Sequence, residues 1–430
     1  MTSAASGSLW RNRSFVALWS AGTISIFGSL ITRTALPWAA ILVLDAGALD
    51  VAALRGVEQV AALIVGLFAG AWVDRLRRRP IMIWADIGRA ILLASIPVAF
   101  VANALGMLHL VVVAFFAAVL STVFDVAERS YLPTVVPRRQ LVSANSAITA
   151  SGSVAEFTSF GLGGFLINVL KAPIAIAVDA ASFVVSALLL SRIRTEEPPP
   201  KSLRDREPVL REIREGLRIT AGSPVLRALA LAHGGTHILW GVFGTAYLLY
   251  AKEELDLDPA ATGIIAAVGG IGSLLGSLAV PWAVRRFGVG RTILGGMFLF
   301  TFGNLLIPVA PAHAALLGAG FLVAQQLIGD SGGTVYEIVE TSLVHSSVDN
   351  RVIGRVNASF FTFTTLMTLA GVIIGGVVAE YLGLRTAFAL GLVGAVLAIA
   401  VVWFSPVRHM RETTISAGPV LPGEESPLTE

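Results

Sequence analysis

The chain has 430 residues, of which 55% are hydrophobic and only 14% are charged, and its formal net charge is +3. A water-soluble domain has about 25% charged residues, so this composition excludes a soluble globular protein. Cysteine is absent, which excludes disulfides, thiolate metal sites and cysteine nucleophiles. The apolar residues form long runs instead, and a run of about 20 such residues has the length of a helix that crosses a bilayer.

Twelve apolar windows follow one another along the chain and predict twelve transmembrane helices. They lie at residues 15–44, 51–73, 81–101, 108–130, 141–166, 172–190, 225–249, 260–284, 292–309, 314–340, 356–379 and 386–404. No small-residue cleavage site follows the first window, so we interpret it as a retained span.

The longest polar segment divides these windows into six and six. We therefore expect an N-terminal six-helix bundle at residues 1–191, a linker at 192–224 and a C-terminal six-helix bundle at 225–405. Within the linker, the stretch PVLREIREGLRIT has apolar residues at helical spacing and predicts an amphipathic helix. The polar, proline-containing residues 406–430 predict a disordered tail.

Arginines alternate from loop to loop and predict the orientation. Loops on one side carry most of them, at Arg11, Arg13, Arg75–Arg79, Arg138, Arg139, the linker, Arg285, Arg286, Arg351, Arg355 and Arg408. The positive-inside rule then places both termini and the linker in the cytoplasm, in a multi-pass protein of the inner membrane. Because these cations lie at span ends, they indicate contact with the lipid bilayer and no nucleic acid.

The two halves repeat each other. Four pairs of segments align at a nearly constant offset and place Gly66 against Gly276, Asp125 against Glu337, Asn145 against Asn357, and Ser159 against Gly371. Such a repeat predicts an all-α fold of two pseudo-symmetric bundles, with a site between them and alternating access by rocking.

The loop after the second span has a dense basic motif. It reads Gly-x-x-x-Asp-Arg-x-x-Arg-Arg, and its fixed positions are Gly70, Asp74, Arg75, Arg78 and Arg79. With this motif, the chain resembles the major facilitator superfamily over essentially its whole length, although Arg77 stands where that family usually has glycine. The stretches WADIGRA, LPTVVPRRQLVSAN and VDAASFVVSALL are similar to drug:proton antiporter family 3, which exports drugs, macrolides and siderophores. The helix 5 motif Gly-Pro-x-x-Gly-Gly of such antiporters reads SFGLGG here.

Two acids follow at the cytoplasmic end of the fourth span. Asp125 and Glu128 are spaced i,i+3 and share one helix face. The resemblance implies that an acid here joins the basic motif in a gating latch, and that Glu337 and Glu340 do the same opposite Arg285 and Arg286. The alternative is a static ion cluster that orients the helices.

Ionisable residues inside spans are candidates for function. Counting from the first outer loop places Arg33 and Glu58 at similar depth, so we expect them to pair, either as a structural pair or with Glu58 as acceptor of a proton or cationic substrate. Glu156 is a second carrier candidate.

In the resembled superfamily helices 1, 4, 7 and 10 line the cavity, which makes Asp330 the leading candidate for coupling, with helix packing as its alternative. His237 can titrate and Trp240 can stack on flat or cationic drugs, or His237 can be merely hydrogen-bonded.

Other classes lack their motifs. No lysine follows a glycine, so there is no phosphate loop, and no histidine precedes a glutamate, so there is no zinc-protease motif. We therefore expect no enzyme activity and no cofactor. The predicted function is proton-coupled efflux of an amphipathic small molecule by a monomer. An uptake permease or a non-transporting sensor of the same fold is the alternative.

Overall fold

The computed structural model describes residues 9–73, 76–195, 197, 209–349 and 351–412, and within these ranges it is nearly all helical and has no strand. The first half contains α1 (Arg13–Val43), α2 (Ala48–Val73), α3 (Arg78–Val101), α4 (Met107–Val135), α5 (Leu141–Leu170) and α6 (Ala172–Ser191). The second half contains α7 (Val209–Gly222), α8 (Pro224–Glu253), α9 (Pro259–Phe287), α10 (Val289–Val309), α11 (Ala315–Gln325), α12 (Ser331–Ser346), α13 (Ile353–Leu382) and α14 (Leu384–Trp403). Short helices flank them at η1 (Leu9–Arg11), η2 (Arg138–Gln140), η4 (Gln326–Asp330) and η5 (Pro406–His409).

Among the described residues, eight helices are long and apolar enough to cross a membrane: α1, α3, α4, α6, α9, α10, α13 and α14. A ninth is added if the bent pair Arg138–Glu156 and Gly161–Leu170 forms one span. The expected all-helical membrane protein is thus confirmed, but with fewer clear spans than the twelve predicted. One reason is that the window at 314–340 is divided into α11, the π-helical turn η4 and α12.

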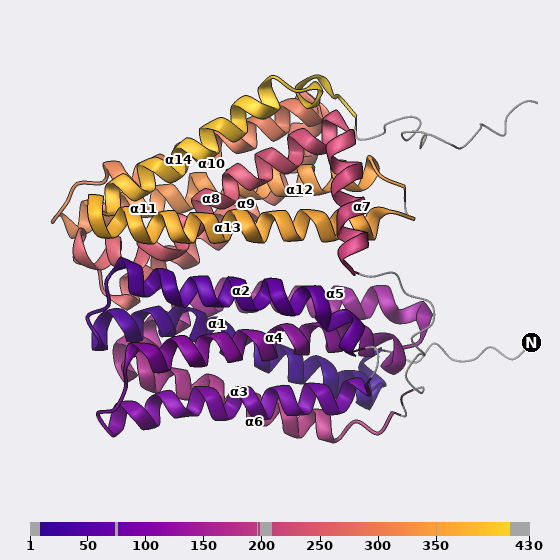
Figure 1. Ribbon diagram of the computed structural model, residues 1–430, viewed down its shortest axis with the longest axis vertical. Helices are drawn as coiled ribbons and strands as arrows, with labels where there is room; N and C mark the ends of the chain where they lie inside the picture. The colour runs from indigo at the N-terminus through magenta and orange to yellow at the C-terminus, as the bar shows by residue number, and fades with distance from the viewer. Residues whose placement is uncertain (1–8, 74–75, 196, 198–208, 350, 413–430) are drawn as a thin grey trace, which may run out of the picture.

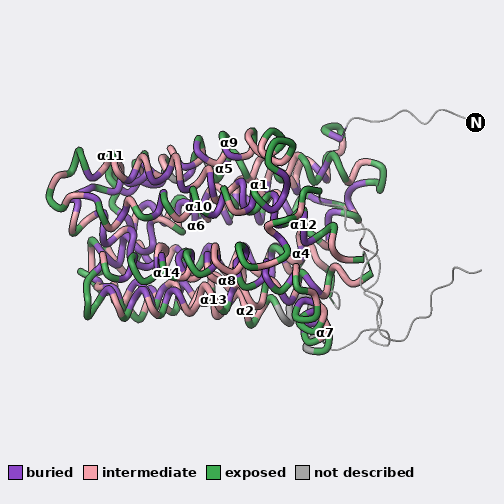
Figure 2. Tube along the Cα trace, turned by 90° about the horizontal axis from the view of Figure 1, so that it is seen from above, coloured by how far each residue is buried: buried purple, intermediate pink, exposed green. Residues whose placement is uncertain are grey.

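The helices of both halves run roughly parallel across the picture in Figure 1, with one half above the other along the longest axis. Helices α1–α6 form one half, and α8–α14 form the other. We call the end that carries η1, α7 and η5 the linker end, and the opposite end, with the loops at 44–47, 254–258 and 310–314, the far end. Seen from above in Figure 2, buried and exposed stretches alternate along the helices, as expected for helices that pack on one face.

Three apolar clusters show where the halves meet. One cluster at the linker end lies within the first half and includes Phe15 and Tyr131, and another lies within the second half and includes Leu343. The third and largest contains residues of both halves, such as Trp38 and Tyr250, each fully buried. The halves therefore share one core toward the far end and have separate cores at the linker end.

Two segments at the linker end pack against the second half. The amphipathic helix α7 lies on α13, where Gly216 approaches the backbone of Arg355 and Glu215 forms a 2.7 Å ion pair with the same arginine. The sequence places the start of a disordered tail at residue 406, and this boundary is wrong. Residues 406–409 form η5, because Val407 is apolar and buries its side chain completely in the cluster of the second half. Residues 413–430 lie outside the described residues.

Candidate functional site

Two helix pairs make the most extensive contacts between the halves, and the sequence repeat relates them. Helix α2 packs on α13, and α5 packs on α9. The repeat aligns the end of α2 with α9 and α5 with α13, so these two contacts are equivalent. Their glycines have matching positions: Gly164 of α5 lies directly against the carbonyl of Pro259, and Gly376 of α13 lies directly against Ala52. Each glycine permits a close approach that any side chain would block.

Polar contacts reinforce this junction at the far end. The Glu380 carboxylate accepts hydrogen bonds from the amides of Ala48 (3.1 Å) and Leu49 (3.4 Å), in the first turn of α2. The Lys252 ammonium donates to the carbonyl of Ile41 in the last turn of α1, at 3.2 Å. An acid at a helix N-terminus and a base at a helix C-terminus are both favourable placements.

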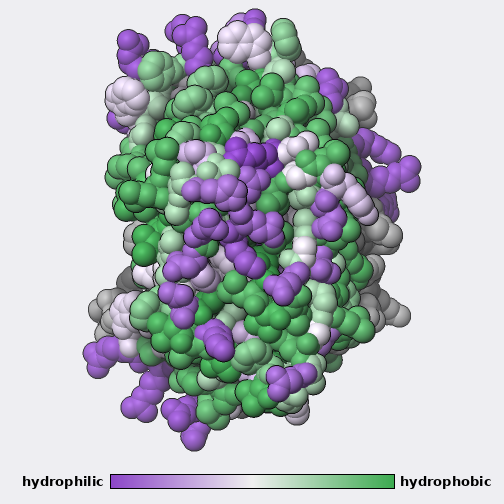
Figure 3. Space-filling model, turned by 90° about the vertical axis from the view of Figure 1, so that its left-hand side faces the viewer, coloured by the Kyte–Doolittle hydropathy of each residue, from purple (hydrophilic) through white to green (hydrophobic). Residues whose placement is uncertain are grey.

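A third contact comes from Arg55, whose Nε donates to the carbonyl of Gly244 across the junction, at 3.3 Å. We call Arg55, Lys252 and Glu380 the far-end latch. Figure 3 views the far end, where hydrophilic groups gather near the middle of the face and apolar groups surround them.

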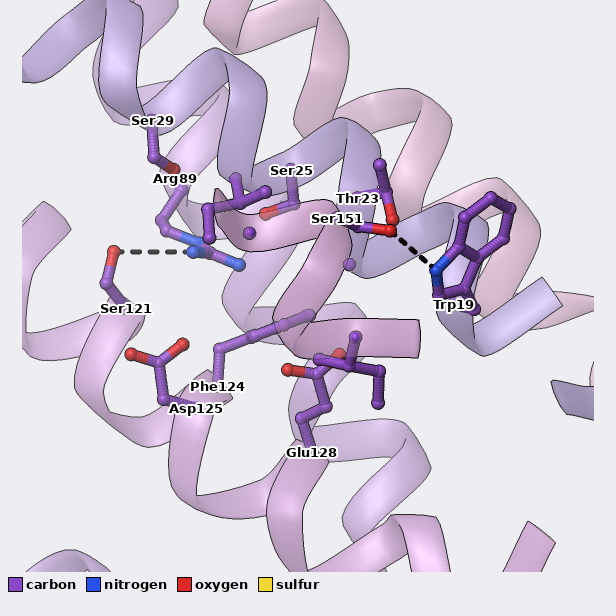
Figure 4. Close-up of a pocket in the computed structure, with 14 residues that line it drawn as sticks. Trp19, Thr23, Ser25, Ser29, Arg89, Ser121, Phe124, Asp125, Glu128 and Ser151 are labelled. Atoms are coloured by element: carbon purple, nitrogen blue, oxygen red, sulfur yellow. Dashed lines mark hydrogen bonds between the residues drawn. The ribbon is translucent and has the colours of Figure 1, made fainter. Parts of the chain in front are cut away.

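The first half contains a cavity of about 210 Å³. Helices α1, α3, α4 and α5 line it with hydroxyl, charged and aromatic side chains, including Trp19, Thr23, Ser25, Ser29, Arg89, Ser121, Phe124, Asp125, Glu128 and Ser151 (Figure 4). Two hydrogen bonds hold its wall, from Trp19 Nε1 to Ser151 Oγ (2.9 Å) and from Arg89 to Ser121 Oγ (3.3 Å). The cavity can therefore accept a polar group that also stacks on an aromatic ring.

Arg89 fixes the inner wall of this cavity. Its side chain is 3% exposed and pairs with Asp86, which is also buried. The guanidinium lies between the rings of Phe124 and Phe183, at 4.5 and 4.0 Å from their centroids. Because both faces and one edge of the guanidinium are occupied, Arg89 is held in place, and it does not neutralise Asp125 and Glu128 by direct contact.

A second polar cluster lies in the other half, between α8 and α12. His233 Nδ1 is 3.4 Å from a carboxylate oxygen of Glu340, whose side chain is 3% exposed. The ring of His233 stacks on that of His237, with centroids 4.2 Å apart. Trp240, one turn further along α8, packs edge-to-face against Phe243.

Comparison with known proteins identifies the family. Residues 4–426 match the family described as transmembrane secretion effector, a family of major facilitator transporters. The chain belongs to the major facilitator superfamily. The multidrug efflux pump Tap of Mycolicibacterium fortuitum is 27% identical over 89% of this chain and 93% of its own length. Macrolide efflux protein A of Streptococcus pyogenes is 22% identical over 87% of this chain and 92% of its own.

Solved structures of the superfamily share the fold. The nucleoside transporter NupG has a TM-score of 0.70 at 14% identity and covers 91% of this chain and 98% of its own. A bacterial homologue of ferroportin in an inward-facing state also has a TM-score of 0.70, at 18% identity, covering 92% of this chain and 98% of its own. The family match over residues 4–426 makes the chain a multi-pass membrane transporter and not an enzyme.

The superfamily motif is described in part. Asp74 and Arg75 lie outside the described residues, and only the backbone of Gly70 is described, within α2. Arg79 donates to the carbonyls of Leu190 (2.9 Å) and Ser191 at the end of α6, and the Glu197 carboxylate accepts from the amides of Arg78 and Arg79. The Arg79 side chain thus holds α3 to α6, whereas Asp125 and Glu128 face the cavity.

The expected pair of Arg33 and Glu58 is wrong. Glu58 pairs with Arg55 at 3.2 Å, and Arg33 lies 3.8 Å from Glu156 of α5. Similar depth does not bring two residues together when a third side chain, here Arg55, lies nearer on the same helix. Arg55 stands three residues before Glu58, an i,i+3 spacing that could have indicated this pair.

The other acids also have surroundings that the sequence did not indicate. Asp330 ends the π-helical turn η4, and its carboxylate lies directly against Gly269 of α9. Glu340 contacts His233, while Glu337 is exposed on the same helix. Arg285 and Arg286, the partners expected for both glutamates, are exposed at the end of α9. The aligned acid pairs of the two halves thus have different surroundings.

Proposed function

We propose that this transporter exports an amphipathic small molecule in exchange for protons, by alternating access. The observation that carries the proposal is the asymmetry of the junction: a shared core and the latch hold the halves together toward the far end, whereas their cores are separate at the linker end. Opening the far end while closing the linker end would complete a transport cycle. The efflux relatives, at 22–27% identity, favour the outward direction.

The orientation follows from charge. The arginine-rich loops lie at the linker end, so the positive-inside rule makes this end cytoplasmic. Both termini then lie on the cytoplasmic side of the inner membrane. The conformation described here is then inward-facing. We further propose twelve spans, in which α2, α5, α8 and the combined α11–η4–α12 add to the eight clear ones, arranged as bundles 1–191 and 225–405 around the linker 192–224.

The cavity suits a substrate with a basic group. Asp125 and Glu128 supply negative charge on its wall, and Trp19 supplies a ring face that attracts cations. With a volume of about 210 Å³, the cavity holds a polar head and leaves the apolar remainder of a larger molecule outside. Asp330, Glu156 with Arg33, and Glu58 are proposed to carry coupling charge, and His237 and Trp240 to contact substrate. The motif from Gly70 to Arg79 is proposed to gate the linker end.

Everted membrane vesicles test this proposal. Their cytoplasmic face is outward, so an exporter should accumulate ethidium, an amphipathic cation, when the lumen is acidified, and a protonophore should abolish the accumulation. Neutral and anionic amphipathic dyes serve as matched probes. Export of any of them supports the transport proposal, and a preference for ethidium supports the basic group. Binding of the dyes without flux would identify a sensor, and depletion from the lumen would identify an uptake permease.

A further inference from the structure

A buried acid with a histidine as its ion-pair partner lies in the second half, outside the lining of the proposed substrate cavity. Glu340 of α12 is 3% exposed, and one of its oxygens is 3.4 Å from His233 Nδ1 of α8, while its other oxygen has no hydrogen-bond partner within the described residues. Around the pair lie the ring of His237 on α8, Tyr336 on α12 and Phe360 on α13. The site is therefore enclosed by three helices of the second half.

The pair needs a proton to be stable in this position. Transferring a carboxylate from water to a buried site costs several kcal/mol of free energy, unless an opposite charge or a bound proton neutralises it. No arginine or lysine pairs with Glu340 in the part of the chain described here. Only a proton can do so, either on the carboxyl or on the imidazole, and in both cases the pair has no net charge.

The neighbouring titratable groups do not supply this proton. His237 Nδ1 lies 2.9 Å from the carbonyl of His233, which can only accept, so this nitrogen carries its own hydrogen and the proton is committed to that bond. Glu337 is close enough to interact with His233 electrostatically but is exposed and acidic, and Glu156 acts on Glu337 from α5. The ring of Tyr336, whose centroid lies 6.3 Å from that of His233, adds no cation. The surroundings thus add negative charge and no competing cation.

We propose that His233 and Glu340 bind a coupling proton of the transport cycle, in addition to the acids assigned to coupling above, at a site in the second half that is separate from the substrate cavity in the first half. This inference rests on the proposed function, because it names the residues that hold the driving ion. Loss of the proton leaves a buried carboxylate beside a neutral histidine. The far-end-closed conformation, in which Glu340 is buried, then becomes less stable than one in which Glu340 reaches water. Proton release and opening of the far end are thereby linked.

Cross-linking across the far end measures this linkage in the full-length protein. Leu49 of α2 and Tyr381 of α13 are exposed, by 40% and 74%, on either side of the Glu380 contact. Because the chain has no cysteine, Leu49→Cys with Tyr381→Cys gives a clean reporter pair in lipid nanodiscs. We expect the yield of a short bismaleimide cross-link to fall as the pH rises from about 5 to about 8, the range in which histidine changes charge.

Substitutions distinguish the site from the function. In the reporter background, Glu340→Gln keeps a neutral, protonated-like side chain, and we expect it to remain cross-linked at every pH. His233→Asn should also lose the pH response, and Glu337→Gln, an exposed acid on the same helix, should keep it. If both Glu340→Gln and His233→Asn respond as the parent does, the proton site is elsewhere and coupling stands. If the parent itself shows no response while ethidium export is intact, both the site and its linkage to the far end are wrong.

Discussion

The close approach of α5 to α9 offers a sharp test of the far-end junction. Gly164→Ala places a methyl group directly against the carbonyl oxygen of Pro259 and 3.0 Å from Gly263 Cα. Both obstacles are backbone atoms, so the helices must separate instead of a side chain rotating away. Overpacking of this kind costs about 1–3 kcal/mol. If this free-energy penalty applies only to the far-end-closed state, the population of that state relative to the open state falls by about 5- to 150-fold.

The cysteine pair at Leu49 and Tyr381 reports this shift from the opposite side of the junction. Because α2–α13 and α5–α9 are equivalent contacts, we expect Gly164→Ala to reduce cross-linking there, although neither label touches α5. Gly295→Ala is the matched control, since the space around this α10 glycine is open and alanine is the better helix former. Cross-linking of Gly164→Ala equal to that of the control would refute the reasoning that the halves close as rigid bodies on these glycines.

Three further changes test the latch, the cavity wall and Asp330. Glu380→Gln removes the charge at the N-terminus of α2 and should weaken far-end closure by about 0.3–1 kcal/mol, seen as a modest loss of the same cross-link; an unchanged yield would remove Glu380 from the latch. Arg89→Met leaves Asp86 buried without its partner and should lower the free energy of unfolding by about 3–5 kcal/mol, seen as a large fall in the thermal unfolding midpoint. Adding Asp86→Leu to the same chain should restore the midpoint. A persistent fall in the double variant would argue against an uncompensated charge. Asp330→Asn should abolish ethidium export driven by a pH gradient at normal expression, and intact export would remove its assigned role.

The helical architecture could be predicted because its signals are local. Runs of bilayer length and the arginine asymmetry depend on neighbouring residues alone, and the family match supports the transporter fold that they indicate. The repeat also predicted which helices correspond, and the matching positions of Gly164 and Gly376 agree with it. The count of spans is harder, because breaks such as η4 divide an apolar window without changing its composition.

The partners of charged side chains could not be predicted with the same success. Counting residues along a helix gives depth but not the direction in which a side chain points. The count therefore predicts Glu58 as the partner of Arg33, whereas the structure pairs Arg33 with Glu156. The histidine partner of Glu340 lies more than a hundred residues away in sequence, on another helix. Such contacts depend on how the helices pack, which the period of one helix does not encode.

Paired distance measurements test the central claim most directly, namely that the two ends of the transporter open in alternation. Spin labels at Leu49 and Tyr381 report the far end, and labels at Val142 of α5 and His345 of α12, both exposed, report the linker end. Raising the pH should lengthen the far-end distance and shorten the linker-end distance in the same samples, by double electron–electron resonance. Distances that lengthen together, or a linker end that does not respond when the far end opens, would contradict the account.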